Sequence, residues 1–322
     1  MRSPLLSSLF LLALSGCDRL TSPSIHDAGP DSLAALWEHV DAGTVNLNAV
    51  AGSNPDNVVV VGDQGTILHW DGTAVQREES GTSVNLRGVA VVDETLAFAV
   101  GEQGTVLRRQ DGAWMTEDPI TTMVLNAVCA TAGYAMAVGE QGTILLFKAG
   151  LWSSLTNAQN DNYYAVTDTS AGPVVVGSMG IVVQPNIQTG TIPSPANVEG
   201  FKLLAGATRT SSGAYLVGVD GGFFSWASGK ATRTKLSPDL PRKFLRGVSV
   251  VEGTTWIVGH EGLVAKVESG SKLSLVPTPD DRWVLGVYAA APADLWIVGR
   301  SGLILRGPPG VRGVLPDGGA RD

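Results

Sequence analysis

Cysteine, histidine and charge are all scarce in this sequence. Its 322 residues include 2 cysteines and 4 histidines, and 16% are charged, whereas about 25% is usual. Two cysteines exclude a disulfide framework. The histidines (His26, His39, His69 and His260) form no zinc-type spacing with Cys or Asp. Nucleophile elbows, phosphate-binding loops and His-Glu-x-x-His motifs are also missing, so the sequence indicates no common catalytic motif.

Basic charge is scarce too. Lys and Arg number 22 against 30 Asp and Glu, a net charge of −8. This balance argues against nucleic-acid binding and against electrostatic binding to anionic lipid. The 44% hydrophobic content and mean hydropathy of +0.16 exclude a disordered chain.

The N-terminus has the pattern of an export signal. Arg2 precedes an apolar run over residues 5–14, which is too short to span a bilayer but is typical of a secretory signal. The run ends in Leu14-Ser15-Gly16-Cys17, which resembles the lipobox of bacterial lipoproteins. That resemblance implies cleavage before Cys17 and acylation of Cys17. An ordinary cleaved signal peptide with a chance cysteine is the alternative.

We therefore expect residues 1–16 to be a signal peptide and residues 17–33 to be a lipidated Cys17 with a flexible tether. Cleavage leaves 21 basic and 30 acidic residues, a net charge of −9. Two or more acyl chains anchor a protein stably to a membrane. The expected location is the cell envelope, and the choice of membrane and leaflet stays open. Cys129 then has no disulfide partner, and we predict that it is buried in an apolar core.

Glycine is abundant, with 40 residues against roughly 23 at average usage. Many glycines belong to a Val-Gly-x-x-Gly signature that occurs seven times. Its first glycines lie 39, 38, 38, 41, 41 and 40 residues apart. The copies begin at Val61, Val100, Val138, Val176, Val217, Val258 and Val298. Each marks one copy of an internal repeat.

Each repeat also contains an apolar-x-small motif whose third position lies 11 or 12 residues before the signature valine. Its third position is always Ala or Gly: Ala49, Gly88, Ala127, Ala165, Gly206, Gly247 and Gly286. Short β-prone runs and turn glycines complete each unit, so a unit of about 40 residues contains four strands, as propeller blades do. The sequence predicts an all-β fold, a seven-bladed β-propeller of four-stranded antiparallel blades over residues 34–308. We expect residues 309–322 to be a flexible tail.

Three details follow from this fold. The small third position suits a crowded inner strand. The signature glycines are expected to supply the positive φ of a tight hairpin. The last repeat lacks a clear fourth strand, so we predict that residues 36–41 provide it and close the ring. The alternatives are a short helix, since Leu33, Leu36, Trp37 and Val40 have helical spacing, or closure by the C-terminal tail.

The segments Val61–Gly72 and Val100–Trp114 resemble the blade motif of the photosystem II assembly and stability factor family. They also resemble Asp-box (BNR-like) propellers, although no complete Asp-box is present. The first resemblance implies binding of partner proteins, partly through an arginine-rich patch. No such patch is evident in this acidic sequence. An Asp-box glycosidase would need convergent arginines, a nucleophilic tyrosine and acidic partners, and the candidates form no recognisable set of that kind: Arg87, Arg209, Arg246, Arg300, Tyr164 and Tyr288.

Two groups of polar residues are candidate sites. The signature turns of the first three repeats carry a carboxylate and an amide each, a candidate partner or cation site: Asp63, Gln64, Glu102, Gln103, Glu140 and Gln141. Polar residues of the inner strands are candidates for the channel mouth: Asn48, Arg87, Asn126, Tyr164 and Arg246. The alternatives are solvated turns and residues that hydrogen-bond channel waters.

The leading hypothesis is a membrane-anchored, non-catalytic propeller that binds a protein or peptide partner on one face. It is expected to be monomeric, to need no cofactor and to bind no nucleic acid. One alternative is a glycan hydrolase or lyase acting at the channel mouth. The other is a cation-stabilised structural propeller.

Overall fold

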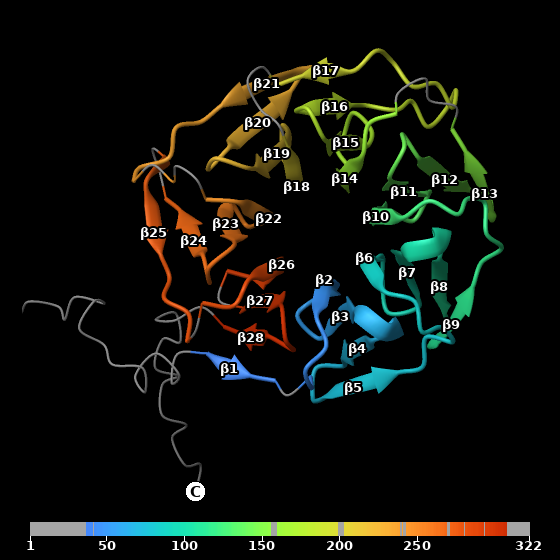
Figure 1. Cartoon of the computed structure of the whole chain (residues 1–322), viewed down its shortest axis with the longest axis horizontal. Helices are drawn as coiled ribbons and strands as arrows, with labels where there is room; N and C mark the ends of the chain where they lie inside the picture. The colour runs from blue at the N-terminus through green and yellow to red at the C-terminus, as the bar shows by residue number, and fades with distance from the viewer. Residues whose placement is uncertain are drawn as a thin grey trace, which may run out of the picture.

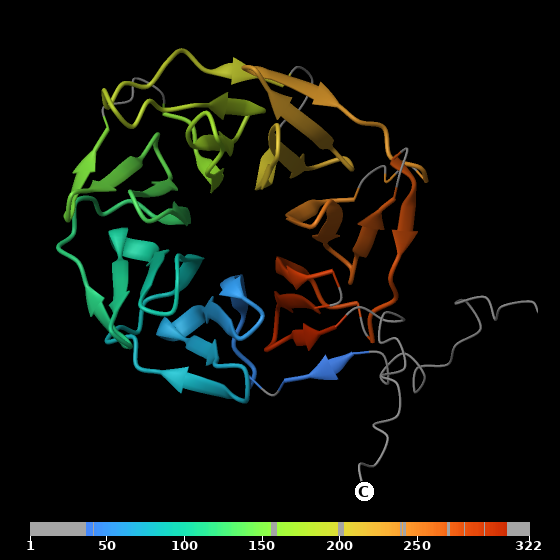
Figure 2. The same ribbon diagram turned by 180° about the vertical axis from the view of Figure 1, so that it is seen from behind.

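Seven four-stranded antiparallel sheets form a ring in the described part of the chain (Figures 1 and 2). The computed structural model describes residues 37–40, 42–155, 160–198, 203–238, 240, 243–268, 271–279, 281–292 and 294–307. The seven-bladed β-propeller is therefore confirmed. Within these residues no helix has the length and apolarity that crossing a bilayer requires.

Blades one to six run outward from the central channel in chain order, whereas the outermost strand of blade seven is the first strand of the chain. Blade one comprises β2 (Leu47–Asn54), β3 (Asn57–Gly62), β4 (Ile67–Trp70) and β5 (Val75–Glu78). Blade two comprises β6 (Leu86–Val91), β7 (Leu96–Gly101), β8 (Val106–Gln110) and β9 (Ala113–Thr116). Blade three comprises β10 (Leu125–Ala130), β11 (Ala135–Gly139), β12 (Ile144–Lys148) and β13 (Leu151–Ser154).

The remaining blades repeat this plan. Blade four comprises β14 (Tyr163–Thr167), β15 (Val174–Gly177), β16 (Ile181–Val183) and β17 (Ala196–Asn197). Blade five comprises β18 (Leu204–Thr210), β19 (Gly213–Gly218), β20 (Phe223–Ala227) and β21 (Lys230–Arg233). Blade six comprises β22 (Leu245–Val251), β23 (Thr254–Gly259), β24 (Val264–Val267) and β25 (Leu273–Leu275). Blade seven comprises β26 (Val284–Ala291), β27 (Asp294–Gly299), β28 (Ile304–Arg306) and β1 (Glu38–His39).

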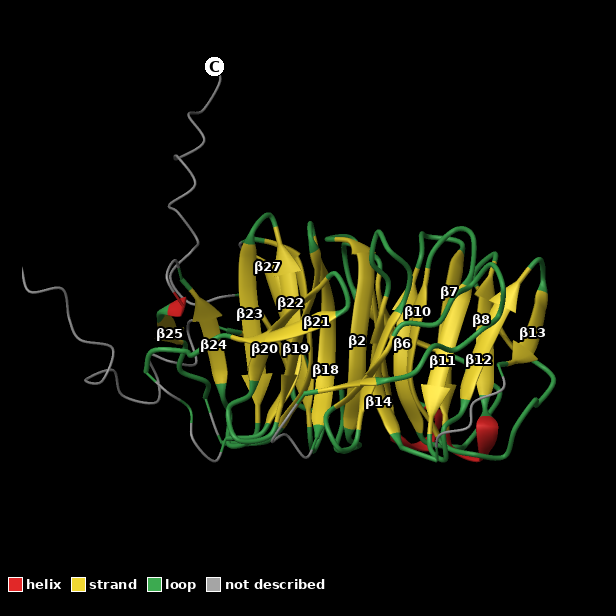
Figure 3. Cartoon of the chain, turned by 90° about the horizontal axis from the view of Figure 1, so that it is seen from above, coloured by secondary structure: helices red, strands yellow, loops and turns green. Residues whose placement is uncertain are grey.

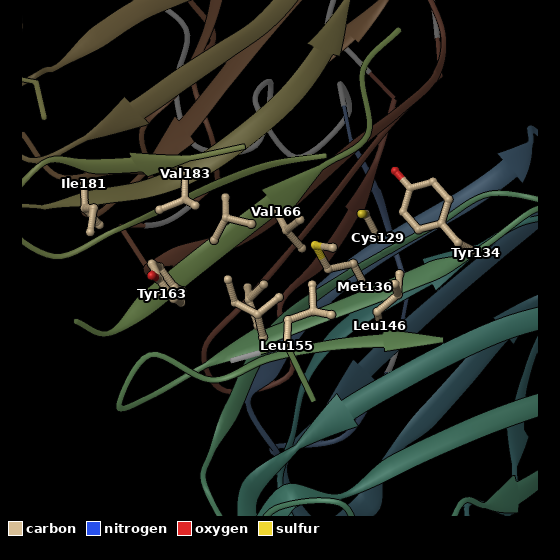
Figure 4. Close-up of a cluster of buried hydrophobic side chains, with 12 residues drawn as sticks. Cys129, Tyr134, Met136, Leu146, Leu155, Tyr163, Val166, Ile181 and Val183 are labelled. Carbon is tan, nitrogen blue, oxygen red and sulfur yellow. The ribbon is translucent and has the colours of Figure 1, made fainter. Parts of the chain in front are cut away.

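Apolar cores lie between adjacent blades, which explains the low charge content. Between blades three and four, Met136, Tyr163 and Ile181 are buried together with Cys129 (Figure 4). Cys129 is a free, buried thiol as predicted, and desolvation raises its pKa. Because both faces of a blade's second strand are covered, strands such as β3 and β11 are buried along their whole length.

The ring is closed by the N-terminal strand. β1 pairs antiparallel with β28, with Glu38 opposite Arg306 and His39 opposite Leu305. Trp37, beside this strand, is 4% exposed, and its Nε1 donates a hydrogen bond to the Pro277 carbonyl oxygen at 2.9 Å. Closure by the N-terminal strand is confirmed. The helical and C-terminal alternatives are wrong because β1 occupies the outer edge of β28 in extended conformation.

The signature turns correct one detail of the sequence-based prediction. The left-handed residues are the second x residue and the second glycine, such as Gln64 (φ 56°) and Gly65 (φ 66°). The first glycine, Gly62, is extended at φ −158°. A Cβ on Gly62 would lie 2.3 Å from the carbonyl oxygen of Asn46. The first glycine therefore permits close approach of two backbones rather than a positive φ.

The third position of the inner-strand motif is small because the inner strands are crowded, as predicted. A Cβ on Gly88 would lie 2.9 Å from Cα of Ala127, which belongs to the next blade's inner strand. Inner strands of neighbouring blades thus converge so closely that a larger side chain has no room.

Gly139→Ala tests the role of the first signature glycine. The new Cβ would lie 2.0 Å from the Val124 carbonyl oxygen, and relieving this overlap must move backbone. We expect a loss of about 2 kcal/mol in the free energy of unfolding, measured by urea denaturation. Gly133→Ala is the control, since the nearest atom to its Cβ would be 3.9 Å away; it should be neutral or slightly stabilising. Equal effects of the two changes would contradict this explanation.

Candidate functional site

Every inner strand contains a bulge at the same repeat position. The register between first and second strands shifts between the apolar residue and the small residue of the motif, as between Leu47 and Ala49 or Leu245 and Gly247. A bulge adds one residue and redirects its side chain. The seven bulged residues line a central channel of about 180 Å³: Asn48, Arg87, Asn126, Tyr164, Ala205, Arg246 and Leu285. The five predicted channel residues therefore occupy equivalent places.

A larger hollow, the mouth cavity, has a volume of about 390 Å³. It lies on the side of the ring that carries the signature turns, here called the turn face. The helical turns η2 (Asp63–Gly65) and η3 (Glu102–Gly104) belong to this side, at the lower edge of Figure 3. Residues of blades one, two, six and seven line the cavity: Asn46, Asn48, Asp63, Asn85, Arg87, Glu102, Phe244, Arg246, His260, Trp283, Leu285 and Arg300.

The mouth cavity unites parts of the two predicted groups. Asp63 and Glu102 of the turns meet Asn48, Arg87 and Arg246 of the inner strands there. The other predicted residues do not line the cavity: Gln64, Gln103, Glu140, Gln141, Asn126 and Tyr164. Asn126 and Tyr164 line only the channel. Arg87, Arg246 and Arg300 converge on this cavity although they are far apart in sequence, and the sequence pattern did not indicate this convergence.

The acidic side of the cavity is internally paired. Asp63 accepts hydrogen bonds from Asn46 Nδ2 at 2.8 Å and Asn48 Nδ2 at 2.9 Å. Glu102 Oε1 lies 2.5 Å from Arg87 Nη2. These partners already occupy the carboxylates that a cation would need. Within the described residues, no three His, Cys, Asp or Glu side chains gather as metal ligands.

Five side chains form a continuous stack on the opposite side of the cavity. The Arg246 guanidinium lies 5.4 Å from the centroid of Phe244, and Phe244 lies 4.6 Å from His260. His260 stacks on Trp283 at 3.7 Å with an interplanar angle of 12°. The Arg300 guanidinium lies 3.7 Å from the Trp283 centroid. Both guanidinium groups are therefore positioned by cation–π contacts.

The two stacked arginines differ from Arg87 in lacking a carboxylate partner. In the described part of the chain, no acidic oxygen lies within salt-bridge distance of Arg246 or Arg300. Among the described residues, Arg246 Nε is also buried without a hydrogen-bond acceptor. Desolvation lowers the pKa of Arg246, and the charges of Arg87 and Arg300 lower it further. Desolvation likewise lowers the pKa of His260, followed by the charges of Arg246 and Arg300.

Sequence reasoning missed Phe244 and Trp283, which directly precede the inner strands of blades six and seven. Aligning the repeats shows the signal. The same position is asparagine in blades one, two and four. Asn85 Oδ1 accepts a hydrogen bond from the backbone N–H of Gln64 at 2.9 Å. Asn162 Oδ1 likewise accepts one from the backbone N–H of Gln141 at 3.0 Å. In blades six and seven, aromatic residues stand in place of this asparagine, and they form the stack that lines the cavity instead of a hydrogen bond between blades.

No family model and no curated protein sequence matches this chain. Among solved structures, YCF48 bound to a D1 peptide is similar at 17% identity and TM-score 0.68, over 88% of this chain and 96% of that one. YCF48 from Cyanidioschyzon merolae is similar at 14% identity and TM-score 0.67, over 85% and 99%.

A third similar structure is the WD40 β-propeller domain of Doa1, at 14% identity and TM-score 0.70, over 84% of this chain and 95% of that one. At such identities the likeness establishes the fold alone. YCF48 is a photosystem II assembly factor, so these structures support the propeller part of the resemblance stated above.

Proposed function

We propose that this protein is a membrane-anchored, non-catalytic propeller lipoprotein that binds a protein or peptide partner on the turn face. The observation that carries the proposal is the mouth cavity, where Arg246 and Arg300 stand without carboxylate partners in the described part of the chain. One similar propeller, YCF48, has been solved with a D1 peptide bound. That structure supports a peptide-binding role for this protein. The D1 peptide itself is a ligand of YCF48.

The ring favours binding by preorganisation. The side chains of the mouth cavity come from strand ends and tight turns of four packed blades, and the stack from Arg246 to Arg300 holds two of them in place. Ordering side chains upon binding costs roughly 0.5–1.5 kcal/mol for each flexible side chain. A surface that is already ordered avoids much of this cost.

The anchor is proposed at Cys17, which lies outside the described residues. We expect Cys17→Ala to abolish incorporation of radiolabelled palmitate and to move the protein from the membrane fraction to the soluble fraction, because the acyl chains supply the membrane affinity. Cys129→Ala is the matched control, since this thiol is buried. Retention of both label and membrane association in Cys17→Ala would instead indicate an ordinary signal peptide and another means of attachment.

Partner binding on the turn face can be tested with a bulky label on each side of the ring. Gln103 is exposed on the turn face, and Glu252 is exposed in a turn between β22 and β23 on the other side. Both have left-handed backbone, with φ 56° and 46°, so Gln103→Cys and Glu252→Cys have comparable backbone strain. Each variant is coupled to a polyethylene glycol maleimide and used to capture partners from native membranes, with mass spectrometry as the readout.

The label at position 103 should abolish capture, whereas the label at position 252 should leave it intact. A partner captured equally well with either label would contradict binding on the turn face. Turnover on a panel of glycans that is lost in Arg246→Ala would overturn the non-catalytic assignment. A melting temperature that rises with calcium and loses this response in Glu102→Gln would support the cation-stabilised alternative.

A further inference from the structure

The mouth cavity has an uneven charge distribution that indicates the chemistry of its ligand. Three guanidinium groups and two carboxylates line it, in a chain whose net charge is −8. Arg87 is paired with Glu102, and Asp63 is held by two asparagine amides. The excess positive charge therefore resides on Arg246 and Arg300.

We propose that the mouth cavity is a carboxylate-binding site in which Arg246 and Arg300 hold a carboxylate group of the peptide partner. This inference rests on the proposed function, since it names the chemistry that the turn face recognises. The carboxylate belongs either to the C-terminus of the peptide or to an acidic side chain.

The geometry suits a carboxylate for two reasons. A guanidinium group presents planar, paired N–H donors that match the two oxygens of a carboxylate. Cation–π contacts with Phe244 and Trp283 position these donors before a ligand arrives. In addition, the buried Nε of Arg246 has no acceptor in the described part of the chain. An unsatisfied buried donor is unfavourable, so the Arg246 guanidinium would gain from an acceptor at its remaining N–H groups.

His260 stacks between Phe244 and Trp283 at the site. Its titration therefore makes ligand affinity depend on pH. The charged groups that face it are Arg246, Arg300 and Glu261, and Glu261 is itself paired with Lys243. Desolvation lowers the pKa of His260 most, the two arginines lower it further, and Glu261 raises it. A bound carboxylate offsets the arginine charges and so raises the pKa of His260. The complex therefore takes up protons, and affinity rises as the pH falls through the pKa of His260 in the complex.

We expect affinity to increase by no more than about threefold between pH 8 and pH 5, with most of the gain below pH 6.5, because the pKa of His260 lies below its ordinary value. His260→Phe retains an aromatic ring in the stack but does not titrate, so its affinity should be flat over this range. A pH dependence unchanged in His260→Phe would show that another group is responsible.

The site itself is tested by calorimetric titration of the full chain with three alanine-based probes, all acetylated at the N-terminus. Pentaalanine with a free C-terminus presents a terminal carboxylate, and tetraalanyl-glutamic acid amidated at its C-terminus presents only the side-chain carboxylate. Amidated pentaalanine presents neither. At least one carboxylate probe should bind at least tenfold more tightly than amidated pentaalanine, and which one does so identifies the source of the carboxylate.

Arg246→Gln and Arg300→Gln should each reduce the affinity for the preferred probe by tenfold or more. Arg77→Gln, on the exposed outer strand β5, should have no effect. Arg300 is an exposed turn residue, so its variant remains informative even if Arg246→Gln fails to fold. Equal binding of all three probes, unchanged affinity in both variants, or binding of inorganic phosphate in place of the carboxylate probes would overturn the proposal.

The two proposals fail in distinguishable ways. If a membrane partner is captured on the turn face and Arg246→Gln and Arg300→Gln still retain it, the carboxylate site is wrong and the proposed function stands. If carboxylate probes bind as described but no partner is captured, the site stands and the proposed function is wrong.

Discussion

Replacing Glu78 with alanine is expected to destabilise the protein by about 3–5 kcal/mol, because it leaves the buried guanidinium group of Arg109 without its carboxylate partner. Glu78 lies on the outer strand of blade one and joins blade one to blade two. Its carboxylate accepts hydrogen bonds from Arg109 Nη2 at 2.9 Å and Nε at 3.2 Å and from Trp114 Nε1 at 2.6 Å. His69 Nδ1 lies 3.0 Å from Glu78 Oε1.

The same contacts predict the pH dependence of stability. Desolvation raises the pKa of Glu78, but hydrogen bonds from His69, Arg109 and Trp114 outweigh it and lower the pKa from 4.5 to about 2. The folded state thus binds the proton less readily than the unfolded state. The contribution of Glu78 is complete above pH 4.5 and is lost as the pH falls toward 2.

Urea denaturation followed by tryptophan fluorescence at pH 7 and again at pH 3 measures both effects. The difference in unfolding free energy between wild type and Glu78→Ala should be large at pH 7 and smaller at pH 3. Glu79→Ala is the control, since Glu79 is the exposed neighbour, and it should change stability by less than about 0.5 kcal/mol. Similar losses in the two variants would refute the special role of Glu78.

Replacing Trp37 with alanine is expected to cost about 3–5 kcal/mol, the usual range for a buried tryptophan. Trp37 packs with Trp256, Val264 and Leu305 between blades six and seven. Because Trp37 directly precedes the two-residue strand β1, its burial is a large part of what holds the closing strand on β28. Loss of this contact should therefore also increase hydrogen exchange at Leu305 and Arg306, where β1 pairs.

Leu151→Ala provides the comparison for Trp37→Ala. Leu151 is a large apolar residue on the outer strand β13, but it is 75% exposed, so its removal should change stability by less than about 0.5 kcal/mol. A small effect of Trp37→Ala, with exchange at β28 unaltered, would show that the N-terminal strand does not maintain the closed ring.

Much of the fold was predictable from the repeats. The spacing of the Val-Gly-x-x-Gly copies predicted seven blades, and the missing fourth strand of the last repeat predicted that residues 36–41 complete the last blade. Trp256 and Trp296 each stand two residues before a signature valine, and both are buried in the core at 2% and 1% exposed. Repeat position determines these features because equivalent residues occupy equivalent places in successive blades.

The candidate site was only partly predictable. The polar inner-strand residues were identified as channel-lining residues, yet the bulge that turns them inward is a property of strand pairing. The first signature glycine was assigned a positive φ, whereas it serves close packing against a carbonyl oxygen. The convergence of Arg87, Arg246 and Arg300 was missed because ring closure brings blades one and seven together.

The sequence by itself determined the number of blades, the position of their turns and the small residues at the channel, since these depend on local backbone conformation and on a repeated pattern. Only the tertiary structure decided which side chains share the mouth cavity. That choice depends on the ring, which places the last repeats beside the first and sets the aromatic residues Phe244 and Trp283 between two arginines. A one-dimensional pattern contains each of these residues but not the distances between them, and those distances determine what the cavity can bind.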